Sequence, residues 1–190
     1  MERTYIENKT FESIDFTKDL LTEGDYEDCN FIDCNFSNLN LSNIKFIESD
    51  FVNCNLSLAT LTKTAFRDIK FKNCKLLGLH FDNCNELLFA VNFDNCQLNL
   101  SSFYKRNLKK TIFKDSSLEE VDFTETDLSS SLFYNCNLTK ATFENTILEK
   151  ADFLTSYNYS IDPEKNRIKK AKFSMSGIVG LLDKYDIEIK

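Results

Sequence analysis

The sequence predicts an all-β solenoid of stacked five-residue units, and two features of the chain predict it. Phe or Leu returns at every fifth position from Tyr26 to Phe153, with one interruption. A small apolar residue stands two positions before most of these, and Asn or Asp often separates the two. Neither an amphipathic helix nor an alternating strand has this period, so the repeat itself defines the fold.

The large apolar residues form the first column. Of the 18 Phe, all but Phe89 fall on the five-residue grid, and from Phe93 to Phe153 Phe and Leu alternate strictly. Five residues cannot bury two inward side chains alone, so the units must stack on one another. If four units form one coil, residues 20 apart lie directly above one another, with a rise of about 4.8 Å between coils.

The small apolar residues form the second column, which contains most of the cysteines. Six of the seven lie in this inward slot, and Cys84 occupies it in the register before the interruption. The six are Cys29, Cys34, Cys54, Cys74, Cys96 and Cys136. Because a free Cys behaves as a small buried hydrophobe and no zinc-ligand spacing is present, we expect core packing and neither metal nor cofactor.

The pattern divides the chain into three segments. Residues 1–25 are expected to form an N-terminal cap with the first irregular repeats, residues 26–153 the solenoid, and residues 154–190 the final coil, a capping helix and a tail. The phase slips by two residues within 82–87 and is expected to resume at Leu88. This insertion predicts a kink in one coil, with a bulge that alters surface contacts as the alternative.

The C-terminal segment predicts a short helix over Ser176–Tyr185 that closes the open end. Its apolar face consists of Ile178, Leu181, Leu182 and Tyr185, which could also form a self-complementary dimer contact. After it, Ile187 and Ile189 alternate with charged residues, as in a short strand.

Charge is distributed unevenly along the chain, whose net charge is −7. Residues 1–33 contain ten acidic and three basic residues, the body is close to neutral, and residues 163–172 contain five basic residues and one acidic. The acidic balance disfavours direct binding of nucleic acid. No apolar stretch is long enough for a bilayer and the first residues lack a signal-peptide layout, so a cytoplasmic protein with no membrane partner is expected.

Catalysis is not expected. His80 is the single histidine, and the four glycines form no phosphate-binding loop. A convex rod also lacks a desolvated cleft that could shift the pKa of its carboxylates. The sequence therefore predicts a binding surface rather than an enzyme.

The repeat over Phe31–Phe153 resembles the pentapeptide-repeat family, whose motif reads A(D/N)LXX. The resemblance implies a right-handed quadrilateral β-helix. The ending DPEKNRIKKAKFS looks like the tails of topoisomerase-protecting members, which include the Qnr quinolone-resistance group and immunity proteins of gyrase-targeting toxins.

Resemblance to those members implies a rod-shaped homodimer joined at the C-terminal ends. It also implies imitation of DNA and binding to DNA gyrase or topoisomerase IV, which would be protected from quinolones or toxins. The best acidic candidates on the body for contacting such a partner are Glu119, Glu120, Asp122, Glu125 and Asp127. The alternative is a generic protein-interaction scaffold with an unidentified partner.

Overall fold

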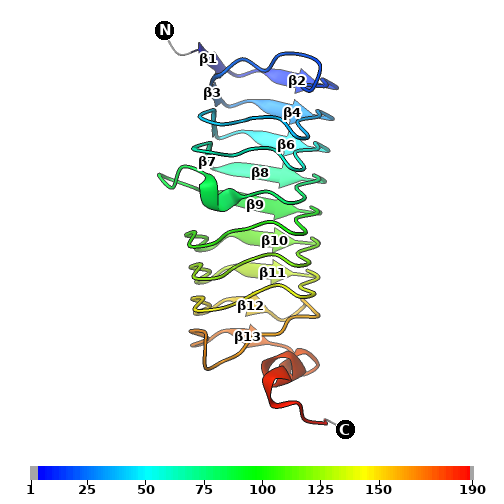
Figure 1. Ribbon diagram of the computed structural model, residues 1–190, viewed down its shortest axis with the longest axis vertical. Coiled ribbons are helices and arrows are strands. Elements are labelled where there is room, and N and C mark those ends of the chain that lie inside the picture. The colour runs from blue at the N-terminus through cyan, green and yellow to red at the C-terminus, as the bar shows by residue number, and fades with distance from the viewer. Residues whose placement is uncertain (1–3, 189–190) are drawn as a thin grey trace.

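The computed structural model describes residues 4–188, which wind into an upright rod of stacked coils. The chain begins at one end of the rod and finishes at the other, so sequence order follows height (Figure 1). Each coil has four sides. We number them faces 1 to 4 in chain order. In one coil their inward residues are Tyr26 on face 1, Phe31 on face 2, Phe36 on face 3 and Leu41 on face 4.

Two parallel sheets and a series of isolated bridges build the four faces. Face 1 begins with the four-stranded sheet β1 (Thr4–Glu7), β3 (Gly24–Glu27), β5 (Lys45–Ile47) and β7 (Ala65–Arg67). Face 2 is a nine-stranded sheet of β2 (Thr10–Glu12), β4 (Asn30–Ile32), β6 (Asp50–Val52), β8 (Ile69–Lys72), β9 (Val91–Asp94), β10 (Ile112–Lys114), β11 (Leu132–Tyr134), β12 (Asp152–Phe153) and β13 (Lys172–Phe173). Faces 3 and 4 consist of single parallel bridges, such as Asn35↔Asn55 and Ser102↔Asp122. The fold is the expected right-handed quadrilateral β-helix.

The strand register confirms the coil of four units. Phe31 pairs with Phe51, and Phe51 with Phe71, a step of 20 residues. The rings of Phe113 and Phe133 stack with centroids 4.8 Å apart and planes 7° apart. Neighbouring faces meet edge to face, as Phe113 and Phe123 do at 5.8 Å and 82°. Both geometries are favourable for aromatic pairs, so the Phe ladder forms a continuous core.

The corners of the rod explain why the chain needs few glycines. The second residue after most inward centres has a positive φ, for example 55° at Asn53 and 54° at Asn73. Asn tolerates this left-handed conformation better than most residues. Its side chain also bonds between coils, because Asn73 Nδ2 donates to Asn53 Oδ1 at 3.0 Å and Asn95 Nδ2 donates to Asn73 Oδ1 at 2.9 Å. Asparagine thus supplies both the turn and a ladder that ties the corner together.

The insertion lies slightly later than expected. The normal register holds through Asn85, whose N–H donates to Thr64 O at 2.8 Å, and is displaced by two residues from Val91, which pairs with Ile69. The short 3₁₀ helix η1 (Phe81–Asn83) precedes the loop. The expectation that the apolar register resumes at Leu88 is wrong, because Leu88 is 69% exposed.

Phe89, the one Phe off the grid, packs against the core in place of Leu88. Its ring lies 6.3 Å from that of Phe81. One coil further on, Arg106 fills the inward small slot, and its guanidinium lies 5.7 Å from the Phe89 ring. The side chain of Arg106 therefore supports the loop from below.

The C-terminal end is closed by two 3₁₀ helices, η2 (Gly177–Leu181) and η3 (Asp183–Tyr185), where the sequence predicted one short helix. Ile187 is not in a strand, contrary to expectation, and Ile189 lies outside the described residues. Gly177 and Gly180 pack so tightly against Tyr159 that a Cβ at either position would collide with it. This contact presses the chain into short turns over the last coil.

Candidate interaction surfaces

The five acidic residues expected to contact a partner do not form one patch. Glu119 and Glu120 follow the inward Leu118 of face 3, Asp122 and Glu125 flank Phe123 of face 4, and Asp127 precedes Leu128 of face 1. The segment from Glu119 to Asp127 forms about half of one coil. Because five-residue units wind around a four-sided rod, residues close in sequence point in different directions.

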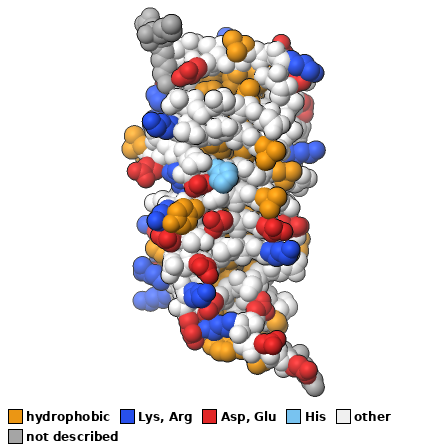
Figure 2. All heavy atoms as spheres, in the orientation of Figure 1, with side chains coloured by type: hydrophobic (Ala, Val, Ile, Leu, Met, Phe, Trp, Pro, Cys, Tyr) orange, Lys and Arg blue, Asp and Glu red, His pale blue; other side chains and the backbone are white. Residues whose placement is uncertain are grey.

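Most of these carboxylates already have partners. Lys140 lies 3.5 Å from Glu120, Lys105 lies 3.5 Å from Glu125, and Lys109 lies 3.1 Å from Asp127. Burial raises the pKa of Asp127, but hydrogen bonds from Ser129 and Lys109 outweigh it and the pKa is lowered overall. Figure 2 shows acidic and basic side chains interspersed over the visible side of the rod. The acidic run is therefore partly neutralised by lysines of adjoining coils.

The C-terminal residues expected to form a dimer contact divide into two pairs. Ile178 and Tyr185 are 43% and 53% exposed. Leu181 and Leu182 are half-buried, and Leu181 packs against the core. Val179, which sequence reasoning missed, is also 45% exposed. The end of the rod thus presents a small apolar surface, while its leucines help to close the solenoid.

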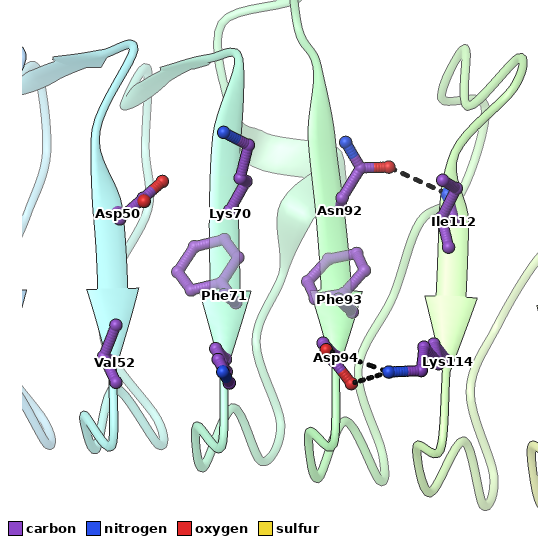
Figure 3. Close-up of a pocket in the computed structure, with 10 residues that line it drawn as sticks. Asp50, Val52, Lys70, Phe71, Asn92, Phe93, Asp94, Ile112 and Lys114 are labelled. Atoms are coloured by element: carbon purple, nitrogen blue, oxygen red, sulfur yellow. Dashed lines mark hydrogen bonds and ion pairs between the residues drawn. The ribbon is translucent and has the colours of Figure 1, made fainter.

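Face 2 contains an open hollow of about 320 Å³ that spans β6 to β10. Figure 3 shows the inward Phe71 and Phe93 behind it and polar side chains around it. Lys114 Nζ lies 3.2 Å from both carboxylate oxygens of Asp94. Asn92 Oδ1 accepts a hydrogen bond from the N–H of Ile112 at 2.9 Å. The hollow is open to solvent, and the charged side chains that line it are exposed or half-buried.

An apolar patch begins at Ile112, on the edge of this hollow, and continues along face 2. Its four members occupy outward slots that are usually polar, and they are Ile112, Leu132, Tyr134 and Leu154, exposed by 43%, 36%, 46% and 47%. Ile112 pairs with Leu132 and Lys114 with Tyr134, so the members come from successive strands. Sequence reasoning missed this patch because its members are about 20 residues apart and meet only when the coils are aligned.

The cysteines lie in the core of the rod, and the histidine lies at its surface. All seven cysteines are free and buried, which confirms the expectation of core packing. Cys54 Sγ donates to Phe31 O at 3.3 Å, and burial raises the pKa of Cys136 to about 12. His80 is exposed and lies 3.2 Å from the Asp82 carboxylate. Within residues 4–188 no cluster of His, Cys, Asp or Glu could hold a metal ion, and no helix could span a membrane.

The comparisons agree with this architecture. A family model described as a pentapeptide repeat region matches residues 24–86 and 86–157, which is most of the sequence. The chain belongs to the pentapeptide-repeat family. None of the curated proteins compared with it matches in sequence.

Solved structures are similar in fold at low sequence identity. A trypsin-treated form of QnrB1, a plasmid-mediated fluoroquinolone resistance protein, matches with a TM-score of 0.68 and 18% identity over 98% of this chain and 92% of that one. HetL, a pentapeptide-repeat protein involved in heterocyst differentiation regulation from Nostoc sp. strain PCC 7120, matches with a TM-score of 0.46 and 14% identity over 90% and 88%. At these identities the likeness establishes the fold alone.

Proposed function

We propose that this chain is a non-enzymatic cytoplasmic protein that binds DNA gyrase or topoisomerase IV and protects it from quinolones or gyrase-targeting toxins. The observation that carries the proposal is the full-length similarity in fold to QnrB1, with a TM-score of 0.68 over 98% of the chain. The outward side chains of the rod, rather than a catalytic group, make the contact.

DNA mimicry requires carboxylates in the place of phosphates. Within the acidic run, Glu120 and Glu125 have the most exposed side chains, at 50% and 42%. We propose these two as the principal contacts, with Glu119, Asp122 and Asp127 around them. Binding would exchange their intramolecular lysine partners for basic groups of the topoisomerase.

The proposal includes the homodimer that the resemblance implies at the C-terminal ends. Ile178 and Tyr185 are the exposed members of the proposed contact, and Leu181 and Leu182 are its half-buried members. Tyr185 is held in place because its hydroxyl donates to Glu164 Oε1 at 3.2 Å.

A second candidate function is a protein-interaction scaffold with a partner unrelated to DNA topology. The ion-paired acidic run and the apolar patch on face 2 favour it, because both fit a protein partner without a strongly basic surface.

A supercoiling assay distinguishes the two functions. Purified protein is titrated into gyrase reactions with and without a fluoroquinolone, and topoisomerase IV is tested in parallel. Restored supercoiling with the drug, or inhibition without it, supports the topoisomerase proposal. The variant Glu120→Lys/Glu125→Lys should weaken either effect. Glu144→Lys/Glu149→Lys makes the same change of charge on the next coil and should not. No effect on either enzyme at micromolar protein leaves the scaffold as the better account.

A further inference from the structure

Both sheets have an outer edge at the N-terminal end of the rod. Within residues 4–188, β1 pairs only with β3 and β2 only with β4, and both edge strands lie at the upper end of the molecule (Figure 1). The opposite end is closed by η2 and η3. An unpaired edge offers its backbone groups to a further strand, and solenoids usually cover it with a cap.

The repeat shows which backbone groups the edge offers on face 2. In the next coil, the N–H of Asn30 donates to Lys9 O at 2.8 Å, and the C=O of Ile32 accepts from the preceding coil. Asn30 stands just before the inward Phe of its strand and Ile32 just after it. The equivalent groups of β2 are the N–H of Thr10 and the C=O of Glu12, which therefore point along the rod away from β4. A strand that continues the parallel sheet would bond to both.

The inward residues of the edge strands are only partly covered. Phe11 is half-buried, whereas Phe31 and Phe51 below it in the same column are fully buried. One side of the Phe11 ring stacks on Phe31, with centroids 4.9 Å apart and planes 6° apart. Ile6, the inward residue of β1, is also half-buried. A large apolar residue placed above each of the two would complete the core at this end.

The first coil surrounds this apolar end with negative charge. Residues 4–23 contain five acidic and two basic residues. Lys18 lies 2.9 Å from Asp15, which is neutralised within the coil. The other four carboxylates are exposed, and within the described residues no ion pair includes them; they are Glu7, Glu12, Asp19 and Glu23. Two of them, Glu7 and Glu12, are on the edge strands themselves.

We propose that the N-terminal edge binds an extended basic segment of a partner protein, which adds a parallel strand to each of the two sheets. Inward apolar residues of the segment lie above Ile6 and Phe11, and outward lysines or arginines lie above Glu7 and Glu12. Backbone hydrogen bonds supply affinity in such strand addition, and alternate side chains supply specificity.

The chain already uses both side-chain contacts between its own coils. In β8, the outward Lys70 and Lys72 flank the inward Phe71, whose ring stacks on Phe93 of the following coil with centroids 5.5 Å apart. A lysine and a carboxylate in successive strands form an ion pair on face 1, where Lys45 Nζ lies 2.7 Å from Asp25 Oδ2. A basic strand with inward apolar residues therefore fits the stacking rules of this solenoid.

A second copy of the chain fits this edge less well. Two N-terminal ends would bring carboxylates against carboxylates. The C-terminal end of another copy presents the 3₁₀ helices η2 and η3 instead of an extended segment. The homodimer proposed above leaves both N-terminal edges accessible, because the two ends of the chain lie at opposite ends of the rod (Figure 1).

The probe for this edge is a labelled peptide with the sequence of residues 64–73, TAFRDIKFKN. It contains two repeat units, and in the parallel register its Arg67 and Lys72 lie above the two glutamates of the edge strands. Fluorescence anisotropy of the peptide is followed as the full chain is added. Replacement of its basic residues in Arg67→Glu/Lys70→Glu/Lys72→Glu should weaken binding about tenfold or more. This comparison leaves the protein unchanged, so it does not depend on the folding of a variant.

Variants of the protein then separate strand addition from attraction between charges. Glu7→Lys/Glu12→Lys should weaken binding about tenfold or more, whereas Glu144→Lys/Glu149→Lys, the same change of charge near the other end, should not. Thr10→Pro removes the outward N–H and keeps the charge, and proline is tolerated on an edge strand. It should weaken binding about fivefold through the lost hydrogen bond.

Hydrogen exchange shows where the peptide binds. Bound peptide should slow exchange of the Thr10 amide, whereas the amide of Asp122, which bonds to Ser101 O in the body, should be unaffected. Three results would overturn the proposal: no rise in anisotropy up to about 1 mM protein, equal binding of the basic and the glutamate peptides, or binding that Thr10→Pro leaves unchanged. Association of the chain without peptide that Thr10→Pro abolishes would assign the edge to a second copy instead.

Discussion

Arg106 shows how one residue accommodates an irregular coil. Three other inward slots of its column hold threonines, Thr64, Thr126 and Thr146, and each donates to a carbonyl of the coil before it. Thr126 Oγ1 bonds to Phe103 O at 2.8 Å, and Thr146 Oγ1 bonds to Phe123 O at 2.9 Å. Where the insertion moves the chain away, a threonine is too short. Arg106 Nη2 donates instead to the carbonyls of Asp82 and Cys84, the latter at 2.6 Å.

The variant Arg106→Thr should therefore destabilise the protein although threonine occupies three other inward slots of this column. Two loop carbonyls would lose their donor and a cavity would remain beneath Phe89. We expect the free energy of unfolding, measured in urea, to fall by about 2–3 kcal/mol. Arg167→Thr is the matched control, because Arg167 forms only a surface ion pair with Glu149, and it should cost less than about 1 kcal/mol. Equal effects of the two variants would show that Arg106 does not support the loop.

At the scale of elements, the C-terminal cap depends on a small ionic cluster. Lys184 Nζ lies 2.8 Å from Asp162 and 2.7 Å from Glu164, which joins η3 to the excursion before the last coil. The N–H of Ile161 donates to Gly180 O at 2.8 Å beside this cluster. Hydrogen bonds from Lys184 lower the pKa of both carboxyls below their usual values.

The cap should consequently loosen in acid. Since the folded-state pKa values are depressed, the cluster stabilises the cap above about pH 4.5 and loses this effect as the pH falls through the lowered values. Hydrogen exchange should show a lower protection factor for the Ile161 amide at about pH 3 than at about pH 6, with the loss below about pH 4.5. The amide of Asp122, which bonds to Ser101 O in the body, should keep its protection. Lys184→Met should remove the pH dependence at Ile161, and its persistence would contradict the account.

The repeat was predictable from the sequence because the five-residue pattern within each unit identifies which of its residues point inward. Which of Leu88 and Phe89 points inward could not be predicted, because it depends on packing against Arg106 in the following coil. The division of the cap into η2 and η3 likewise depends on Tyr159 pressing against Gly177 and Gly180. Local patterns thus specified the regular coils, while the irregular elements depend on contacts between distant residues.

The candidate surfaces were less predictable for a related reason. The run from Glu119 to Asp127 is continuous in sequence but turns around the rod. The apolar patch is the reverse case, since Leu132 and Leu154 are far apart in sequence and lie on successive strands of one face. On a solenoid with coils of 20 residues, surfaces become visible when the sequence is arranged by coil.

At the scale of the whole molecule, the protein is a rod with a continuous core of stacked Phe and Leu side chains. Phe or Leu fills nearly every inward position, so the differences that decide a partner lie in the outward slots and corners. There the acidic run, the C-terminal end and face 2 differ in charge and in exposed apolar area. We propose that this exterior takes the place of DNA on a type II topoisomerase.

Competition with DNA tests that claim most directly. Fluorescence anisotropy of a labelled DNA duplex bound to gyrase is followed while the purified protein is added, and topoisomerase IV is examined in the same way. The account predicts that anisotropy falls as the protein displaces DNA, and that Glu120→Lys/Glu125→Lys requires a higher concentration. Unchanged anisotropy with both enzymes, at protein concentrations well above those of the enzyme, would contradict the claim.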